Sequence, residues 1–102
     1  MKELTSFQRD IVTVIAGLGS PHGLAVKKEI SEHYEETINH GRLYPAMDQL
    51  DEAGIIEKSK RDARSNTYEI TEKGLKMLAA QYDWQQSHFT PDAHLMSAVQ
   101  SD

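Results

Sequence analysis

The feature that most constrains the fold of this chain is a change in apolar pattern between residues 39 and 74, from helical spacing to strand alternation and back. The helical part ends at Gly54, which suits the left-handed backbone position that follows a helix. Two short runs, residues 55–59 and 67–71, then predict antiparallel strands joined by a polar turn. Thr71 has the side chain expected of a residue that caps another helix. This stretch therefore predicts a helix, a β-hairpin and a further helix in succession.

Two more helices are predicted before this stretch. Thr5 and Gln8 have the spacing of a capping box, and the apolar residues that follow predict a helix over residues 6–18. Glycine and proline end it, and a second helix is predicted over residues 23–34. The third helix has Asn39 as its expected N-cap and begins near His40. Pro45 would then lie in its second turn, so either this helix begins later or it bends there.

Three helices, a hairpin and a fourth helix form the order of a winged helix-turn-helix domain, a mainly α fold with a small antiparallel β-hairpin. The fourth helix, expected over about residues 72–86, has two apolar stripes. Leu75, Leu78 and Tyr82 form one stripe, and Met77, Ala80 and Trp84 form the other. One stripe is enough to pack on the domain, so the second stripe predicts a contact with another copy of the chain.

The last residues, 87–102, end either in a short helix or in disorder. We expect a winged helix-turn-helix domain at residues 1–71 and a C-terminal dimerisation helix and tail at residues 72–102. The residues expected to hold the dimer together are Met77, Ala80, Trp84, Leu95, Met96 and Val99.

Composition argues against several classes of protein. The chain has no cysteine, so disulfides, thiolate metal sites and thiol redox sensing are excluded. It has no glycine-rich phosphate loop, no nucleophile with a base at recognisable spacing and no His-Glu-x-x-His motif, so we expect no enzyme, no cofactor and no metal site. No apolar run approaches the length of a membrane span, and no signal segment is recognisable at the N-terminus. Cytoplasmic residence without membrane attachment is the expectation.

Positive charge is concentrated on the predicted hairpin, although the net charge of the chain is −5. Four of the seven residues 58–64 are basic, which favours a wing that holds DNA phosphates. The net negative charge leaves a second interpretation open, in which the domain binds protein and not DNA. The candidate DNA-binding residues are Lys27, Lys28, Asn39, His40, Arg42, Tyr44, Lys58, Lys60, Arg61, Arg64 and Asn66.

These candidates also have simpler interpretations. Arg42 begins the groove-reading helix and is the best candidate for a base or backbone contact. Asn39 is more often a helix cap than a base reader, and the Tyr44 ring packs across the helix pair in the alternative account. The lysines of the second helix, Lys27 and Lys28, could belong to a solvated face.

The run Gly41-Arg42-Leu43-Tyr44-Pro45 resembles the recognition helix of PadR-like transcription regulators. Residues 66–74, Asn-Thr-Tyr-Glu-Ile-Thr-Glu-Lys-Gly, resemble their second wing strand and the start of their C-terminal helix. The resemblance covers about residues 5–86, with Met47 where the family usually has Leu and Thr67 where it often has Tyr. It implies a DNA-binding regulator, most often a repressor, of the compact branch that dimerises through one C-terminal helix. The acidic balance and residues 5–30 are similar to PadR-like regulators of halophilic archaea, including one that responds to oxidative stress.

The expected partners are double-stranded DNA with a palindromic operator and a second copy of the chain. Acidic residues flank the candidate DNA-binding residues; they are Glu35, Glu36, Asp48 and Glu57. Cations between these carboxylates and the DNA phosphates are therefore a further expected partner.

Overall fold

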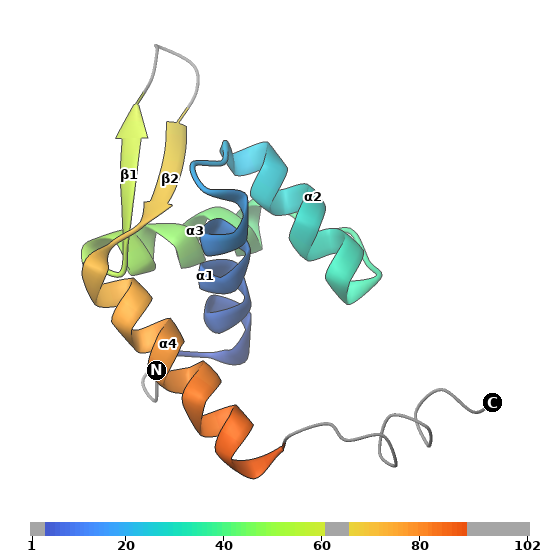
Figure 1. Ribbon diagram of the computed structural model, residues 1–102. Helices are drawn as coiled ribbons and strands as arrows, with labels where there is room; N and C mark the ends of the chain where they lie inside the picture. Colours follow the sequence, from blue (N-terminus) through green and yellow to red (C-terminus); the bar gives the residue numbers. More distant parts are fainter. Residues whose placement is uncertain (1–3, 61–65, 90–102) are drawn as a thin grey trace, which may run out of the picture.

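The computed structural model describes residues 4–60 and 66–89, which form the predicted mainly α fold with one antiparallel hairpin (Figure 1). In chain order, the elements are α1 (Ser6–Leu18), α2 (Gly23–Tyr34), α3 (His40–Glu52), β1 (Ile56–Lys60), β2 (Asn66–Ile70) and α4 (Glu72–His88). The fold class predicted from the sequence, a winged helix-turn-helix with a further C-terminal helix, is confirmed. Among the described residues, no helix is long and apolar enough to cross a lipid bilayer.

The predicted capping residues set the helix boundaries. The Thr5 hydroxyl accepts a hydrogen bond from the Gln8 amide at 3.1 Å, and the Gln8 side chain accepts one from the Thr5 amide at 3.0 Å. This reciprocal capping box satisfies two amides that a helix start would otherwise leave unpaired. The Asn39 side chain likewise accepts from the Arg42 amide at 2.9 Å and begins α3.

Helix α3 begins at His40 and continues through Pro45, so the later start is wrong. In a regular helix the amide of residue 45 donates to the carbonyl of Gly41. Proline has no N–H, so this hydrogen bond is missing. After the helix, Gly54 has φ +76°, the left-handed conformation predicted for it.

Each strand is offset by one residue from its predicted limits: β1 lies one residue later in the chain, and β2 lies one residue earlier. The hairpin register runs from Ile56 opposite Ile70 to Lys60 opposite Asn66. Thr71 lies outside β2 because its hydroxyl accepts from the Gly74 amide and donates to the carbonyl oxygens of residues 54 and 55. Ile55 precedes β1 because its amide still donates to the Leu50 carbonyl at the end of α3.

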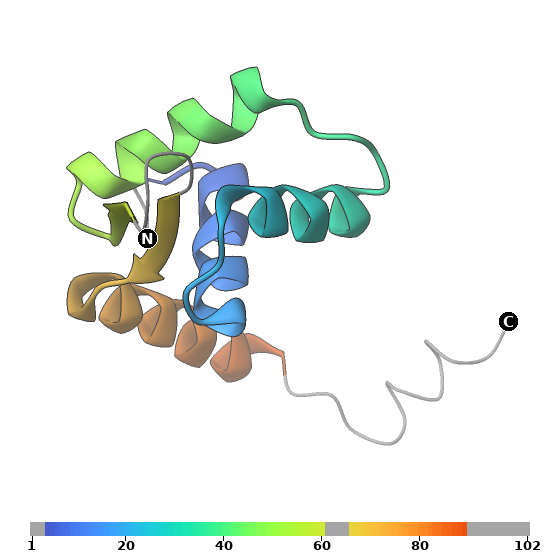
Figure 2. The same cartoon turned by 90° about the horizontal axis from the view of Figure 1, so that it is seen from above.

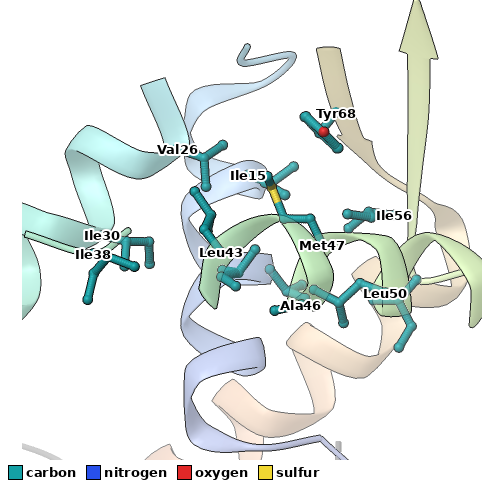
Figure 3. Close-up of a cluster of buried hydrophobic side chains, with 13 residues drawn as sticks. Ile15, Val26, Ile30, Ile38, Leu43, Ala46, Met47, Leu50, Ile56 and Tyr68 are labelled. Carbon is teal, nitrogen blue, oxygen red and sulfur yellow. The ribbon is translucent and has the colours of Figure 1, made fainter. Parts of the chain in front are cut away.

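The core lies where α1, α2, α3 and the hairpin meet, as Figure 3 shows. Its largest member is Tyr68 of β2, of which only 1% is exposed. Burial raises the pKa of the Tyr68 hydroxyl, and the neighbouring Tyr44, Asp48 and Asp51 add to the rise. The Tyr68 amide donates to the Pro21 carbonyl at 3.0 Å, which ties the hairpin to the turn between α1 and α2.

Helix α4 packs against the domain from its first turn. Gly74 is buried so closely against the Ile55 carbonyl and Ile70 that a Cβ at this position would overlap them. Because Gly74 lies so close to Ile55 and Ile70, the side of α4 that carries Met77, Leu78 and Gln81 faces inward. Each of these three residues is half-buried. Figure 2 shows α3 and α4 on opposite sides of α1.

The predicted division of α4 into two stripes is wrong for Met77. Met77 packs against the core of its own domain, whereas Leu75 and Tyr82 are 54% and 58% exposed. The buried Gly74 causes the difference, because it sets which side of the helix faces inward, and a count of apolar spacing does not include glycine. Ala80 and Trp84 do remain on the exposed side.

Candidate nucleic-acid interface

Helix α3 has one buried face and one outward face. Leu43, Ala46, Met47 and Leu50 form the buried face. At 3.6 residues per turn, the opposite side carries Gly41, Pro45, Asp48 and Glu52, all of them exposed. Together these four residues form the outward face of α3. It contains two carboxylates and no basic side chain.

Arg42 lies at the edge of the outward face that borders α1. Its guanidinium carbon is 4.0 Å from the centroid of the Phe7 ring, and its Nη1 is 3.6 Å from a carboxylate oxygen of Glu36. Gln49, two turns later on the same side, accepts a hydrogen bond from Gln8 of α1 at 2.9 Å. The Arg42 side chain is still 47% exposed, so the structure places a positive charge beside the outward face and not at its centre.

The Arg42 guanidinium packs on the rings of Phe7 in α1 and Tyr34 in α2, which contact each other. The Tyr34 hydroxyl donates to Asp10 at 2.6 Å, and the Tyr34 and Phe7 rings lie 5.8 Å apart. Burial and the hydrogen bond to the Asp10 carboxylate raise the pKa of Tyr34 from 10.0 to about 12. The Phe7 and Tyr34 platform was not predicted; Phe7 shows only the apolar spacing of an ordinary helix residue.

For Tyr44 and Asn39, the structure shows the simpler roles. Tyr44 packs against Gly23 at the start of α2, where a Cβ would overlap its ring, and His40 stacks on it at 5.1 Å. Asn39 caps α3. Lys27 and Lys28 lie in the middle of α2, half-buried and exposed respectively.

The hairpin is fastened to α3 by Lys58. Its amide donates to Asp51 at 3.2 Å, and its ammonium lies 3.3 Å from a carboxylate oxygen of Asp48. An exposed ion pair contributes at most about 1 kcal/mol to stability. Its main effect is therefore on where charge is placed, because it brings a cation from the wing onto the outward face of α3. This pair was not predicted from the sequence, because its members are ten residues apart and lie in different elements.

Lys60 and Asn66 are paired at the far end of the described hairpin. The remaining predicted wing contacts, Arg61 and Arg64, lie outside the described residues, as do Leu95, Met96 and Val99 of the predicted dimer contact.

A second surface, away from α3, is a groove of about 420 Å³ between α1 and α4. Asp10 and Thr13 border it from α1, and Leu75, Ala79 and Tyr82 line it from α4. Further along α4, Trp84 and Phe89 are 59% and 56% exposed. Large apolar side chains gathered on one helix are typical of a protein contact surface.

Comparison with known proteins identifies the class. The profile of the transcriptional regulator PadR-like family matches residues 11–80. The structure of H. salinarum RosR is similar with a TM-score of 0.85 and 41% sequence identity, over 97% of this chain and 89% of that chain. No match is found among the curated proteins.

More distant structures share the fold alone. A PadR-like transcription factor from Bacteroides fragilis has a TM-score of 0.68 at 14% identity, over 79% of this chain and 82% of that chain. Streptococcus pneumoniae FabT, solved in complex with DNA, has a TM-score of 0.70 at 14% identity, over 96% of this chain and 69% of that chain.

The fold and the helix-and-wing surface are those of a winged helix-turn-helix DNA-binding transcription regulator. The chain belongs to the transcriptional regulator PadR-like family. Of the two functions that the sequence left open, family membership supports DNA binding over a module that binds only protein.

Proposed function

We propose that the protein acts as a homodimeric repressor on a palindromic operator, with each α3 in a major groove and each hairpin on the adjacent backbone. The observation that carries this proposal is that α3 and α4 lie on opposite sides of α1 (Figure 2). Helix α3 contacts β1 of the basic hairpin, and α4 carries exposed apolar side chains. DNA and a second copy can therefore bind at the same time.

The dimer is supported by the apolar surface of α4. Four large apolar side chains of residues 75–89 are more than half exposed: Leu75, Tyr82, Trp84 and Phe89. A domain of this size also buries a modest core, so a dimer interface would add to its stability. Two-fold symmetry places two copies of α3 about 34 Å, or one turn of DNA, apart and so implies a palindromic operator.

The acidic side chains of the outward face favour binding of cations in the complex with DNA. The outward face brings Asp48 and Glu52 towards a polyanion, while the chain carries a net charge of −5. Cations between carboxylates and phosphates would reduce this repulsion.

The test is a mobility-shift assay of the full chain on the DNA upstream of its own gene, with sedimentation of the same protein. The proposal expects a discrete complex of one dimer per palindrome, and reduced transcription in vitro when the site overlaps the promoter. A monomer on a single half-site would reject the dimer, and increased transcription would reject repression.

A further inference from the structure

The outward face of α3 presents hydrogen-bond acceptors. Pro45 has no N–H, so the Gly41 carbonyl lacks the usual amide partner at this point of the helix. One turn beyond Pro45 lies the Asp48 carboxylate, 54% exposed, and Glu52 follows one turn later. A reading helix usually carries donors such as Arg, so this face differs from the common pattern.

The Asp48 carboxylate is paired in a defined position. The Lys58 ammonium lies 3.3 Å from its Oδ1, and the Lys58 backbone is held in turn by Asp51 at 3.2 Å. Because β1 is attached to α3 at two points, Lys58 would accompany Asp48 into any groove that α3 enters. A carboxylate accepts several hydrogen bonds, so the bond from Lys58 leaves capacity for another donor.

We infer that Asp48 is a specificity-determining residue that accepts a hydrogen bond from the exocyclic amino group of one cytosine in each half-site, with Lys58 as its counterion. The inference rests on the entry of α3 into the major groove proposed above. It assigns Lys58 a different role from the phosphate contact expected from the sequence.

The chemistry of the groove selects cytosine. Phosphates repel a carboxylate and offer it no donor. In the major groove the only donors are the amino groups of adenine and cytosine. Adenine also presents the N7 acceptor beside its amino group, which repels an anion, whereas cytosine presents no acceptor there. Asp48 thus favours a C·G pair, and Lys58 lowers the cost of bringing the carboxylate to the DNA.

The experiment is selection of binding sites from a randomised duplex library by the full-length protein and by Asp48→Asn. The wild type should select cytosine at one position in each half-site, with roughly tenfold discrimination against the other bases. An asparagine side chain pairs with adenine N6 and N7, so Asp48→Asn should replace cytosine by adenine at that position and leave the other positions unchanged. An unchanged base preference in Asp48→Asn would overturn the inference.

Glu52→Gln is the matched control, because it removes the same charge from the same face one turn further along. It should change affinity equally for all sequences without changing the selected base. If Glu52→Gln shifts the base preference as Asp48→Asn does, the effect comes from charge and the inference is wrong.

A double-mutant cycle tests the role of Lys58. Lys58→Gln should weaken operator binding more in the wild type than in Asp48→Asn, because only the carboxylate needs a counterion. Equal weakening in both backgrounds would make Lys58 an ordinary phosphate contact and overturn its assigned role. If the wild type selects no sequence at all, the proposed function fails; if it selects a site whose bases do not depend on residue 48, only this inference fails.

Discussion

The Arg42 guanidinium lies over the Phe7 ring, with its carbon 4.0 Å from the ring centroid. This contact joins the first turn of α3 to the first turn of α1 and holds the arginine at the border of the outward face. An exposed cation–π contact contributes roughly 0.5–1 kcal/mol, which a DNA contact can replace. The free protein therefore holds Arg42 beside the outward face of α3.

We expect Arg42→Ala to weaken binding to the operator more than binding to random DNA. A direct base contact by arginine contributes roughly 1–3 kcal/mol of discrimination. Arg42→Lys is the control, because it keeps the charge and loses the planar donor pair. Titrations on both DNAs measure the effect; an equal loss on both, restored by Arg42→Lys, would make Arg42 a phosphate contact.

Removal of the wing charges tests the predicted phosphate contacts. The triple variant Lys60→Ala, Arg61→Ala, Arg64→Ala should bind all DNA more weakly and keep its fold. Each lost phosphate contact should reduce the slope of log affinity against log salt by about one. Lys76→Ala on α4, away from the wing, is the matched control and should leave the slope unchanged. Operator affinity that is unaffected in the triple variant would exclude a wing contact.

Charges placed in the groove between α1 and α4 test whether this surface forms the dimer interface. Leu75→Glu with Tyr82→Glu places two charges on an apolar surface that is exposed in the single chain. Burial of these carboxylates in an interface is costly, so the variant should sediment as a folded monomer. Lys76→Glu, exposed on the same helix, should remain a dimer. A dimer that persists in the double variant would place the interface elsewhere.

Stability should fall between pH 10 and pH 12 because of Tyr34. Its folded pKa of about 12 exceeds the ordinary value of 10.0, chiefly through burial and then through its bond to Asp10. In this window the unfolded chain has released the proton and the folded chain still holds it, so rising pH favours unfolding. Tyr34→Phe should show a smaller loss over the same range in chemical denaturation. A loss as steep as that of the wild type would assign the pH dependence to other groups, such as Tyr68.

Salt should weaken operator binding less than ordinary counterion release predicts. Release of cations from phosphates lowers affinity as salt rises, but uptake of cations beside Glu52 would oppose that trend. At 1 M salt the Debye length is about 3 Å, which also screens repulsion from the acidic residues. Affinity measured from low to molar potassium chloride, with folding followed in parallel, tests this. A steep and continuous loss of affinity by a folded protein would exclude bridging cations.

The elements of this protein were predictable from the sequence because their limits are local. Thr5, Asn39 and Thr71 each cap a helix through an amide three residues away. Gly54 ends α3 through its own backbone conformation. Such contacts span few residues, so the spacing of residue types is enough to predict them.

The arrangement of the candidate interface depended on the tertiary structure. Arg42 meets Phe7 from 35 positions away, and Lys58 meets Asp48 across the boundary between strand and helix. The inward side of α4 likewise depends on the approach of Gly74 to Ile55. These contacts depend on the angles at which helices and strands cross, which arise from packing of the whole core. Periodicity along one element predicts which residues share a face, and only the packed fold decides what that face meets.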